Sequence, residues 1–376
     1  MKNTGKRIFF IDPQSLRNLA IYDYSLQSHF PNGVHYFCSC HYDYQKHENI
    51  NYHYVFKYNH LENNVLKALS YLWSYLIILF YILRLRPNII HVQWFRIPVF
   101  DYYFYKTAKH LVPFKLIYTA HNILPHDTGD KYKAIYSKIY KLTDHIIAHT
   151  KETQNKLNEI FNVSLNNISV IRHGYLKTGV SNNVDTNYQP EYQKKLDGKI
   201  VFSAVGYQYD YKGSDIIAKA WEEYEELNQN KNIVLLIAGM NKGVDFSAIE
   251  NFDNVIIDDR RIPNEEFHQI LLDTDILLLP YKRISQSGIL LSAISASIPV
   301  VVTKLGGLTE PFEVADIGWI IDNADAESLG KQLTYLANNV QEVREKKNNE
   351  KIWQAARDFY SWDEISQKTV DLYFSL

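Results

Sequence analysis

Short apolar runs alternate with longer amphipathic segments along most of this chain. In the first half the apolar runs predict strands at 8–12, 34–39, 88–94, 115–120, 145–149 and 168–171. The segments between them carry apolar residues at helical spacing and predict helices at 21–30, 65–83, 100–111, 133–143 and 152–161. Strands that alternate with helices in this way favour βαβ units and a parallel sheet.

A second alternating set follows a polar, turn-rich stretch. Its predicted strands lie at 199–206, 233–238, 255–257, 276–279, 299–303 and 319–321, and the chain is helical from 351 onward with a break near Ser361. We therefore expect an α/β fold with two doubly wound, Rossmann-like domains facing across a cleft. The expected parts are a domain at 1–175, a linker region at 176–198, a domain at 199–355, and a C-terminal helix at 356–376 packing back on the first domain.

Composition argues against a nucleic-acid-binding protein and against a disulfide-rich one. The 376 residues are enough for two domains, and a net charge of -2 with 22% charged residues argues against bulk binding of nucleic acid. Two cysteines, Cys38 and Cys40, are too few for a disulfide framework and fit a reducing compartment. Residues 1–7 are polar and lead directly into the first strand, so we expect a cytoplasmic protein.

The segment 68–83 contains no charged residue and is rich in aromatic side chains. Lys67 precedes it, and Arg84 and Arg86 follow. A helical span of the hydrocarbon core needs about 20 residues, so the segment is short for one. Three interpretations stay open: a core helix with one apolar exposed face, a helix lying in the membrane surface, and a membrane span. We expect contact with the inner face of the cell membrane through 65–86.

The loop at 279–291 has the pattern of a phosphate-binding loop. An apolar strand ends at Pro280, the cations Lys282 and Arg283 follow, and Gly288 precedes a helix. A strand–loop–helix unit presents backbone N–H groups and a positive helix end to an anion. The strand at 299–303 also ends in glycines, Gly306 and Gly307. Two such loops on successive strands indicate a nucleoside diphosphate.

Other strand ends carry further candidates. His121 follows the strand at 115–120; it is either a structural histidine or an imidazole placed beside a reacting sugar. Lys212 lies between the strand end Gly206 and a helix start near Ser214. It is either a solvated loop lysine or a cation that neutralises a diphosphate. The turn at 172–174 also ends a strand and is either a plain turn or part of the site.

No segment has convincing metal-ligand spacing. Asp273 and Asp275 have the spacing of a metal-binding pair, but they precede the strand at 276–279 and so lie at the wrong end of the sheet. We interpret them as a helix end and turn. No other carboxylate pair or His/Cys cluster has metal-ligand spacing, and the sequence contains no nucleophile elbow and no lysine-bearing P-loop. We expect neither a metal nor a cofactor.

Six segments in order resemble one enzyme family. They are 91–94, 118–126, 170–174, 206–215, 236–239 and 279–310. The set resembles the retaining, nucleotide-sugar-dependent glycosyltransferases of family four, which have the GT-B fold. The resemblance implies that 199–355 holds a UDP- or GDP-sugar, that 1–175 holds the acceptor, and that no metal is needed. It also implies front-face substitution, in which the leaving diphosphate accepts the acceptor's proton.

Site residues follow from the matched positions. The resemblance implies that His121 is the catalytic residue, and Lys212 is expected on the diphosphate with backbone N–H groups of Ser287 and Gly288. The full set of expected donor contacts is Gly206, Lys212, Lys282, Arg283, Ser285, Gln286, Ser287, Gly288, Gly307 and Glu310. The acceptor-side candidates are Gln14, Gln93, Asn122 and His126.

Two departures from the family pattern bear on the function. The family has two glutamates at the positions that Ile284 and Ser292 occupy here, and often an arginine in the stretch 207–211, which contains none. Lys282 or Arg283 would supply the missing charge. We expect transfer of a sugar, with retention, to a lipid-linked or polysaccharide acceptor in cell-surface glycan synthesis (exopolysaccharide, capsule or lipopolysaccharide). The alternatives are a catalytically silent partner protein and a sugar-nucleotide epimerase on the same fold.

Overall fold

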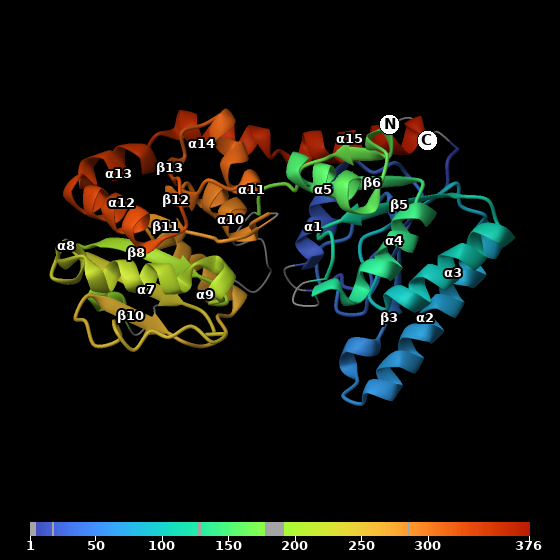
Figure 1. Cartoon of the computed structure of the whole chain (residues 1–376). Helices are drawn as coiled ribbons and strands as arrows, with labels where there is room; N and C mark the ends of the chain where they lie inside the picture. Colours follow the sequence, from blue (N-terminus) through green and yellow to red (C-terminus); the bar gives the residue numbers. More distant parts are fainter. Residues whose placement is uncertain (1–4, 17–18, 126–128, 177–191, 285) are drawn as a thin grey trace. The chain divides into compact units, whose positions relative to one another are not determined.

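The chain folds into two compact units in a computed structural model (Figure 1). The structure describes residues 5–16, 19–125, 129–176, 192–284 and 286–376. Unit 1 consists of Met1–Gly174 together with Trp362–Leu376, and unit 2 of Tyr175–Ser361. Each unit has its own sheet and its own hydrophobic core, and each is described separately.

Unit 1 is built on a seven-stranded parallel sheet. The strand order is β3-β2-β1-β4-β5-β6-β7. In chain order the strands are β1 (Ile8–Ile11), β2 (Val34–Ser39), β3 (Ile50–Phe56), β4 (Ile89–Val92), β5 (Lys115–Ala120), β6 (His145–Ala148) and β7 (Ile168–Val170). The helices are α1 (Ala20–Leu26), α2 (Asn64–Leu85), α3 (Pro98–Leu111), α4 (Lys133–Leu142), α5 (Lys151–Phe161) and α15 (Trp362–Ser375). Short 3₁₀ turns are η2 (Gln27–His29), η3 (Tyr58–His60), η4 (Gly129–Tyr132) and η5 (Leu165–Asn167).

Strand β3 is absent from the sequence-based prediction. It lies at the sheet edge, pairs only with β2, and keeps most of its side chains partly exposed. Its residues therefore alternate polar and aromatic side chains and lack the continuous apolar run that marks a buried parallel strand.

Both faces of the unit 1 sheet are covered. Phe9 and Ile11 point into a cluster shared with α2, α3, α4 and α5, whereas Ile8 and Phe10 point into a cluster shared with α1 and α15. The C-terminal helix α15, red in Figure 1, thus belongs to this core, and its Tyr373 is fully buried. Burial on both faces explains why β1 has four consecutive apolar residues.

Helix α2 differs from an ordinary core helix. One stripe is buried: Tyr71, Ser74, Tyr75, Ile78 and Ile82. The other sides expose large apolar side chains, namely Val65, Leu66, Leu69, Leu72, Trp73, Leu76, Phe80 and Leu83. Among the described residues, α2 is the one helix long and apolar enough to cross a membrane, with mean hydropathy 1.7 and 28% of its most apolar window buried. The buried stripe nevertheless belongs to the core of unit 1.

Unit 2 repeats the architecture with six parallel strands in the order β10-β9-β8-β11-β12-β13. The strands are β8 (Ile200–Val205), β9 (Ile233–Ala238), β10 (Val255–Asp258), β11 (Ile276–Leu279), β12 (Val300–Thr303) and β13 (Gly318–Ile321). The helices and 3₁₀ turns are α6 (Gln193–Leu196), η6 (Asp210–Lys212), α7 (Ser214–Glu223), α8 (Glu225–Asn228), α9 (Asn264–Leu272), α10 (Gly288–Ala296), α11 (Gly306–Thr309), η7 (Glu310–Glu313), α12 (Ala326–Asn338), α13 (Val340–Lys347) and α14 (Glu350–Phe359). Two buried clusters cover the two faces of the sheet, which confirms two doubly wound, Rossmann-like domains.

The segment expected as a linker region is only partly described. Residues 177–191 lie outside the described residues. Beyond them α6 forms a single helical turn, and its Leu196 is buried in the unit 2 core.

Each sheet has a point at which the strand order reverses. In unit 2 the chain runs outward from β8 to β9 and β10, then crosses to β11, so the reversal lies between β8 and β11. In unit 1 it lies between β1 and β4. Open α/β sheets bind ligands beyond the carboxyl ends of the strands at such a switch point. Ligand-binding groups are therefore expected at these two places.

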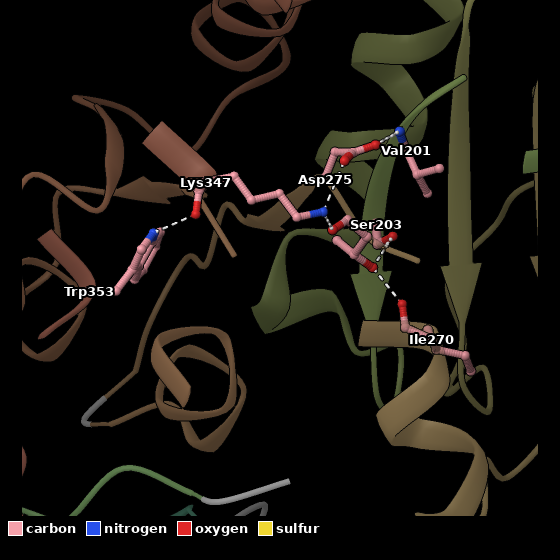
Figure 2. A network of polar contacts seen from close by, with 7 residues as sticks. Val201, Ser203, Ile270, Asp275, Lys347 and Trp353 are labelled. Atoms are coloured by element: carbon pink, nitrogen blue, oxygen red, sulfur yellow. Dashed lines mark hydrogen bonds and ion pairs between the residues drawn. The ribbon is translucent and has the colours of Figure 1, made fainter. Parts of the chain in front are cut away.

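The amino ends of β8 and β11 have a structural role instead (Figure 2). The Asp275 carboxylate accepts a hydrogen bond from the Val201 N–H (3.0 Å) and pairs with the Lys347 ammonium (3.0 Å). Asp273 closes α9 as its C-cap residue. The Asp273–Asp275 segment is therefore a helix end and turn that ties two strands to α13.

Candidate functional site

The first candidate site lies at the switch point of unit 2 and depends on glycine. Gly206 follows β8 with φ +95°, and Gly239 follows β9 with φ +138°. A Cβ atom on Gly239 would lie 2.1 Å from the Gly206 carbonyl oxygen. The two strand ends therefore pack backbone against backbone, and only glycine permits this.

The loops after β8 and β11 are joined to each other. A Cβ atom on Gly213 would lie 2.0 Å from the Pro280 carbonyl oxygen, and Gly213 has φ +74°. The Lys282 N–H donates to the Tyr211 carbonyl over 2.9 Å. Thr303, at the end of β12, donates its hydroxyl to the Tyr281 carbonyl over 2.8 Å. Three adjacent strand ends thus form one connected surface.

The Lys212 ammonium is the cation of this surface. Its Nζ lies 3.5 Å from the position that a Cβ atom on Gly206 would occupy. Burial lowers the pKa of Lys212 to about 8, and no carboxylate of the described residues counteracts that shift. A partly buried cation without a counter-ion is well placed to bind an anion.

Lys282 has a different environment. Its ammonium is held by the carboxylates of Asp210 and Asp215, each at 2.7 Å. The charge of Lys282 is therefore already neutralised within the protein. Arg283 is exposed beside it.

Helix α10 begins next to this surface, because a Cβ atom on Gly206 would lie 3.5 Å from the side chain of Ile289. Ser287 is its N-cap, and the Ser287 hydroxyl accepts the Leu290 N–H (3.2 Å) and lies 3.4 Å from the Tyr281 hydroxyl. The N–H groups of Gly288 and Ile289 open the helix and have no acceptor within it. The serine hydroxyl is thus used by the protein, whereas two backbone donors at the positive helix end are available to a ligand.

The remaining expected donor residues are spread around this centre. Gln286 is half-buried, Gly307 is buried in α11, and Glu310 opens η7 half-buried. Ser285 lies outside the described residues.

The second candidate site lies in unit 1, at the ends of β4, β5 and β6. A chain of hydrogen bonds connects the polar side chains that follow these strands. The Gln93 carboxamide lies 2.9 Å from His121 Nε2, and His121 Nδ1 lies 3.2 Å from His149 Nε2. His149 Nδ1 in turn lies 2.9 Å from the Ile171 carbonyl oxygen. His121 therefore has a partner on each ring nitrogen.

The same chain extends to the buried centre of the sheet. The Gln93 carboxamide also lies 3.1 Å from His91 Nε2, and His91 Nδ1 lies 2.6 Å from the Tyr373 hydroxyl. His91 Nε2 is 2.7 Å from the Thr119 hydroxyl. Helix α15 thus supplies one end of the network.

The chain determines the tautomers of neutral imidazoles. A carbonyl oxygen only accepts, so His149 Nδ1 carries the hydrogen that points to Ile171. His149 Nε2 then accepts from His121 Nδ1, and His121 Nε2 is left as an acceptor. The structure places Gln93 Oε1 toward His121 Nε2, so this tautomer requires the carboxamide to be turned by 180° so that its NH₂ group donates to His121. In this arrangement the Ile171 carbonyl, acting through His149, sets the tautomer of His121, and the Gln93 amide follows it.

Burial keeps these imidazoles neutral. Burial lowers the pKa of His91 and of His149 to about 3 and that of His173 to about 4. Burial and the neighbouring imidazoles, with His149 first among them, lower the pKa of His121 well below its usual value. At neutral pH, His121 is therefore an uncharged hydrogen-bonding group.

Aromatic rings enclose His121. Trp94 stacks on it at 4.5 Å with an interplanar angle of 8°, and Tyr22 meets its ring edge at 5.0 Å. A Cβ atom on Gly174 would lie 2.3 Å from the Trp362 ring, so the turn at 172–174 needs glycine to admit this indole. The motif that reads as a plain turn in the sequence is therefore part of the enclosure.

The sequence matches two glycosyltransferase families, one in each half. Residues 32–175 match the profile described as Glycosyltransferase Family 4, and residues 198–339 match the profile described as Glycosyl transferases group 1. The matched segments contain His121 and Lys212 with the strand ends that carry them, and the fold is that of the GT-B enzymes. By family, this chain is a glycosyltransferase of the GT-B type.

Individual relatives are distant from this glycosyltransferase. A curated D-inositol 3-phosphate glycosyltransferase of Corynebacterium efficiens is 24% identical over 242 residues, which cover 61% of this chain and 56% of that protein. The chain thus aligns with little more than half the length of that curated relative.

Two solved structures share the fold over nearly the whole chain. Anabaena Alr3699/HepE in complex with UDP and glucose has a TM-score of 0.69 at 12% identity, covering 99% of this chain and 100% of that one. Sucrose-phosphate synthase from Thermosynechococcus elongatus has a TM-score of 0.68 at 13% identity, with 98% coverage of each.

The two positions where the family has glutamates are apolar or buried in this glycosyltransferase. Ile284 packs against the core cluster under the loop. Ser292 is buried in α10, and its hydroxyl donates to the Gly288 carbonyl over 3.1 Å. Neither position supplies a carboxylate to the donor surface.

A pair of buried carboxyl groups lies near the unit 1 site. Asp12 follows β1 and accepts the Gln14 N–H at 2.6 Å, while Asp23 of α1 accepts the Tyr36 hydroxyl at 2.5 Å. Burial raises the pKa of both, more strongly for Asp23, and the negative charge of Asp12 raises the pKa of Asp23 further. The sequence places Asp12 at a strand end, but nothing in it indicates that Asp23 from the following helix faces it.

The other acceptor-side candidates are only partly placed. Gln14 and Asn122 are half-buried at strand ends of unit 1. His126 lies outside the described residues.

One group of possible metal ligands cannot be seen in the spacing along the sequence. Cys40, His41 and His60 lie together, with their possible ligand atoms within 4.8 Å of one another. Twenty residues separate Cys40 from His60, so linear spacing hides the cluster; the pairing of β2 with β3 creates it.

Proposed function

We propose that this glycosyltransferase uses a nucleoside-diphosphate sugar, UDP- or GDP-linked, as donor. The observation that carries the proposal is the Lys212 ammonium beside Gly206, at the β8–β11 switch point, together with the N–H groups that open α10. A cation and a helix N-terminus converging on a glycine-lined strand end fit a diphosphate. The UDP in the complex of the structurally similar Anabaena protein agrees with this choice.

In the proposed reaction the sugar keeps its anomeric configuration. The bond between the sugar C1 and the diphosphate oxygen breaks, and the acceptor oxygen bonds to C1 on the same face. The departing diphosphate oxygen takes the acceptor's proton. Lys212 and the α10 N–H groups stabilise the charge that develops on the diphosphate, so the chain's own residues supply this stabilisation without a metal.

Unit 1 is proposed to bind the acceptor. Its strand ends offer neutral hydrogen-bonding groups and aromatic rings, which suit sugar hydroxyls better than phosphates. His121, uncharged and held by Gln93 and His149, is proposed to position a sugar hydroxyl rather than to act as a base. The acceptor is proposed to be a lipid-linked or polysaccharide glycan of the cell surface.

Contact with the inner face of the cell membrane is proposed through α2. The helix contains no acidic residue, its exposed sides carry leucines with Trp73 and Phe80, and Lys67, Arg84 and Arg86 lie at its two ends. Apolar side chains flanked by cations suit the surface of an anionic bilayer. Because the opposite stripe is part of the unit 1 core, α2 is proposed to lie on the membrane rather than cross it.

Sugar release and transfer from a panel of UDP- and GDP-sugars test the reaction. One donor is expected to turn over with a lipid-linked or oligosaccharide acceptor, and Mg²⁺ or Mn²⁺ is expected to change the rate less than about twofold. Lys212→Ala and His121→Ala are expected to lower kcat/KM by about 100-fold or more. Lys331→Ala, an exposed lysine of α12 that pairs with Glu327 one turn away, is the matched control and is expected to leave the rate unchanged.

The substitutions at Ile284 and Ser292 make a silent partner protein the specific alternative. Tight binding of a nucleotide without turnover on any donor–acceptor pair would favour it. Interconversion of free UDP-sugars without an acceptor would indicate an epimerase instead.

Flotation with vesicles tests the membrane proposal separately. The protein is expected to float with vesicles of phosphatidylglycerol and phosphatidylcholine and less with phosphatidylcholine alone. Trp73→Glu with Phe80→Glu is expected to weaken binding at least about tenfold, because these side chains are 65% and 59% exposed. Ile160→Glu with Leu165→Glu, also exposed in unit 1, is the control. Equal flotation of both double variants would rule out α2 as the contact.

A further inference from the structure

The edge of the unit 1 sheet gathers three metal-ligand side chains that the reaction does not use. Cys40 and His41 follow β2, and His60 ends η3, the turn that follows β3. Their possible ligand atoms, one sulfur and two imidazole nitrogens, lie within 4.8 Å of one another. We propose that Cys40, His41 and His60 bind a borderline divalent cation, Zn²⁺ before others.

The backbone holds the three residues at this place. The Cys40 N–H donates to the Phe56 carbonyl over 3.1 Å and so extends the β2–β3 ladder by one residue. The His41 N–H donates to the Ser39 hydroxyl over 3.2 Å. His60 is fixed by the η3 turn, in which its N–H donates to the Lys57 carbonyl over 3.3 Å. The side chains therefore converge because of strand pairing, not because of a flexible loop.

The separation of the ligand atoms is close to that of a bound metal. Zn–S and Zn–N bonds of about 2.3 Å and 2.0–2.1 Å place tetrahedral ligand atoms roughly 3.4–3.6 Å apart. Rotations that move the side-chain tips by about 1 Å would close the site from the present 4.8 Å limit. His41 and His60 are exposed, which leaves them room to turn.

The donor set selects the cation. One thiolate and two imidazoles suit Zn²⁺ and discriminate against Mg²⁺ and Ca²⁺, which prefer oxygen. The imidazole rings of His41 and His60 have centroids only 3.9 Å apart, so one cation can reach a nitrogen of each ring. Three protein ligands leave a fourth position for water.

A metal at this site would stabilise the turn η3, which precedes α2. Tyr58, in the same turn as His60, is buried and packs its ring 5.6 Å from that of Tyr71 in α2. A metal bound to His60 and Cys40 would tie this turn to the end of β2. Metal binding is therefore expected to raise the thermal stability of the protein.

Titration of the metal-free, reduced full-length protein with Co²⁺ tests the proposal. One equivalent is expected to bind with a near-ultraviolet thiolate-to-cobalt charge-transfer band and visible bands of tetrahedral intensity, and Zn²⁺ is expected to displace it. Cys40→Ser is expected to abolish the charge-transfer band. His41→Gln and His60→Gln are each expected to weaken Co²⁺ binding at least tenfold.

Cys38→Ser is the matched control. Cys38, the other cysteine, is buried, its thiol donates to the His53 carbonyl over 3.6 Å, and it is not one of the three clustered ligands. This variant is expected to keep the band and the stoichiometry. A band that survives in Cys40→Ser, or one that never appears in the wild type, would overturn the proposal. Comparing the thermal melting of every variant without metal separates loss of the site from loss of the fold.

Discussion

The two units share one topological feature, a reversal of strand order, but the residues beside that reversal differ in chemical character. Each sheet reverses its strand order once, and each reversal lies beside the chain's candidate polar groups. In unit 2 the strand ends carry glycines, one partly buried lysine and the start of helix α10. In unit 1 the ends of β4, β5 and β6 carry buried histidines, a glutamine and aromatic rings without net charge at neutral pH, and only the neighbouring end of β1 carries a carboxyl group, that of Asp12.

This difference shows that the side chains at a strand end determine which kind of ligand it favours. Removing side chains, as at Gly206 and Gly239, exposes backbone donors and favours an anion. Filling the same position with imidazoles that bond to one another removes charge and favours a neutral, hydroxyl-rich ligand. Substitutions in the two regions test this contrast.

Gly213→Ala should damage unit 2 most. The new Cβ would lie 2.0 Å from the Pro280 carbonyl oxygen, at a position with φ +74°. The free energy of unfolding is expected to fall by about 3 kcal/mol or more, because a backbone clash adds to strain of about 1–2 kcal/mol. Gly243→Ala, with φ +97° and open space, should cost only the strain. Urea unfolding measures both, and equal losses would refute the close packing of the two loops.

Lys212→Ala should weaken nucleotide binding by about 30- to 100-fold, the 2–3 kcal/mol of a charged hydrogen bond. Lys282→Ala should cost less than about fivefold, since Asp210 and Asp215 already neutralise that charge. Calorimetry with UDP and GDP measures the two affinities. Because the pKa of Lys212 is lowered to about 8, wild-type affinity should also fall as the pH rises above 8, and Lys212→Arg should remove that dependence.

His173→Gln should reduce the loss of stability that the protein shows between pH 7 and pH 5. Burial lowers the pKa of His173 from 6.5 to about 4, so between these values the unfolded chain binds a proton that the folded chain does not. Stability is therefore lost as the pH falls through 6.5, by about 2 kcal/mol at pH 5. The difference in unfolding free energy between pH 7 and pH 5 is expected to shrink by that amount. His110→Gln, on the exposed side of α3, should leave the difference unchanged.

Ser287→Ala should distinguish the structural role of the Ser287 hydroxyl from ligand binding by the neighbouring backbone N–H groups. Loss of the N-cap is expected to cost about 1 kcal/mol of stability, with nucleotide affinity reduced less than about threefold, because the proposed contacts are N–H groups. Thr150→Ala removes the N-cap of α5, whose hydroxyl accepts the Thr153 N–H at 3.0 Å, and should cost a similar amount without any change in nucleotide affinity. A large loss of affinity in Ser287→Ala alone would show that the hydroxyl itself contacts the ligand.

Most strands and helices could be predicted because buried parallel strands appear as unbroken apolar runs. The edge strand β3 could not, since its half-exposed face accepts polar side chains. The hydrogen-bond and ion-pair partners of the site residues could not be predicted either. Nothing in the sequence shows that Lys282 is neutralised from another loop, or that the Ser287 hydroxyl is used as a helix cap.

Sequence patterns alone were enough to predict the alternation of strands and helices, the two-unit α/β architecture and the strand-end positions of Lys212 and His121. These follow from local periodicity and from the rule that parallel strands carry their ligands at one edge. The folded structure was needed to show which groups meet there: Gln93 with His121 and His149, Asp12 with Asp23, and Cys40 with His60. Such encounters depend on strand pairing between residues far apart in the chain, which no local pattern encodes.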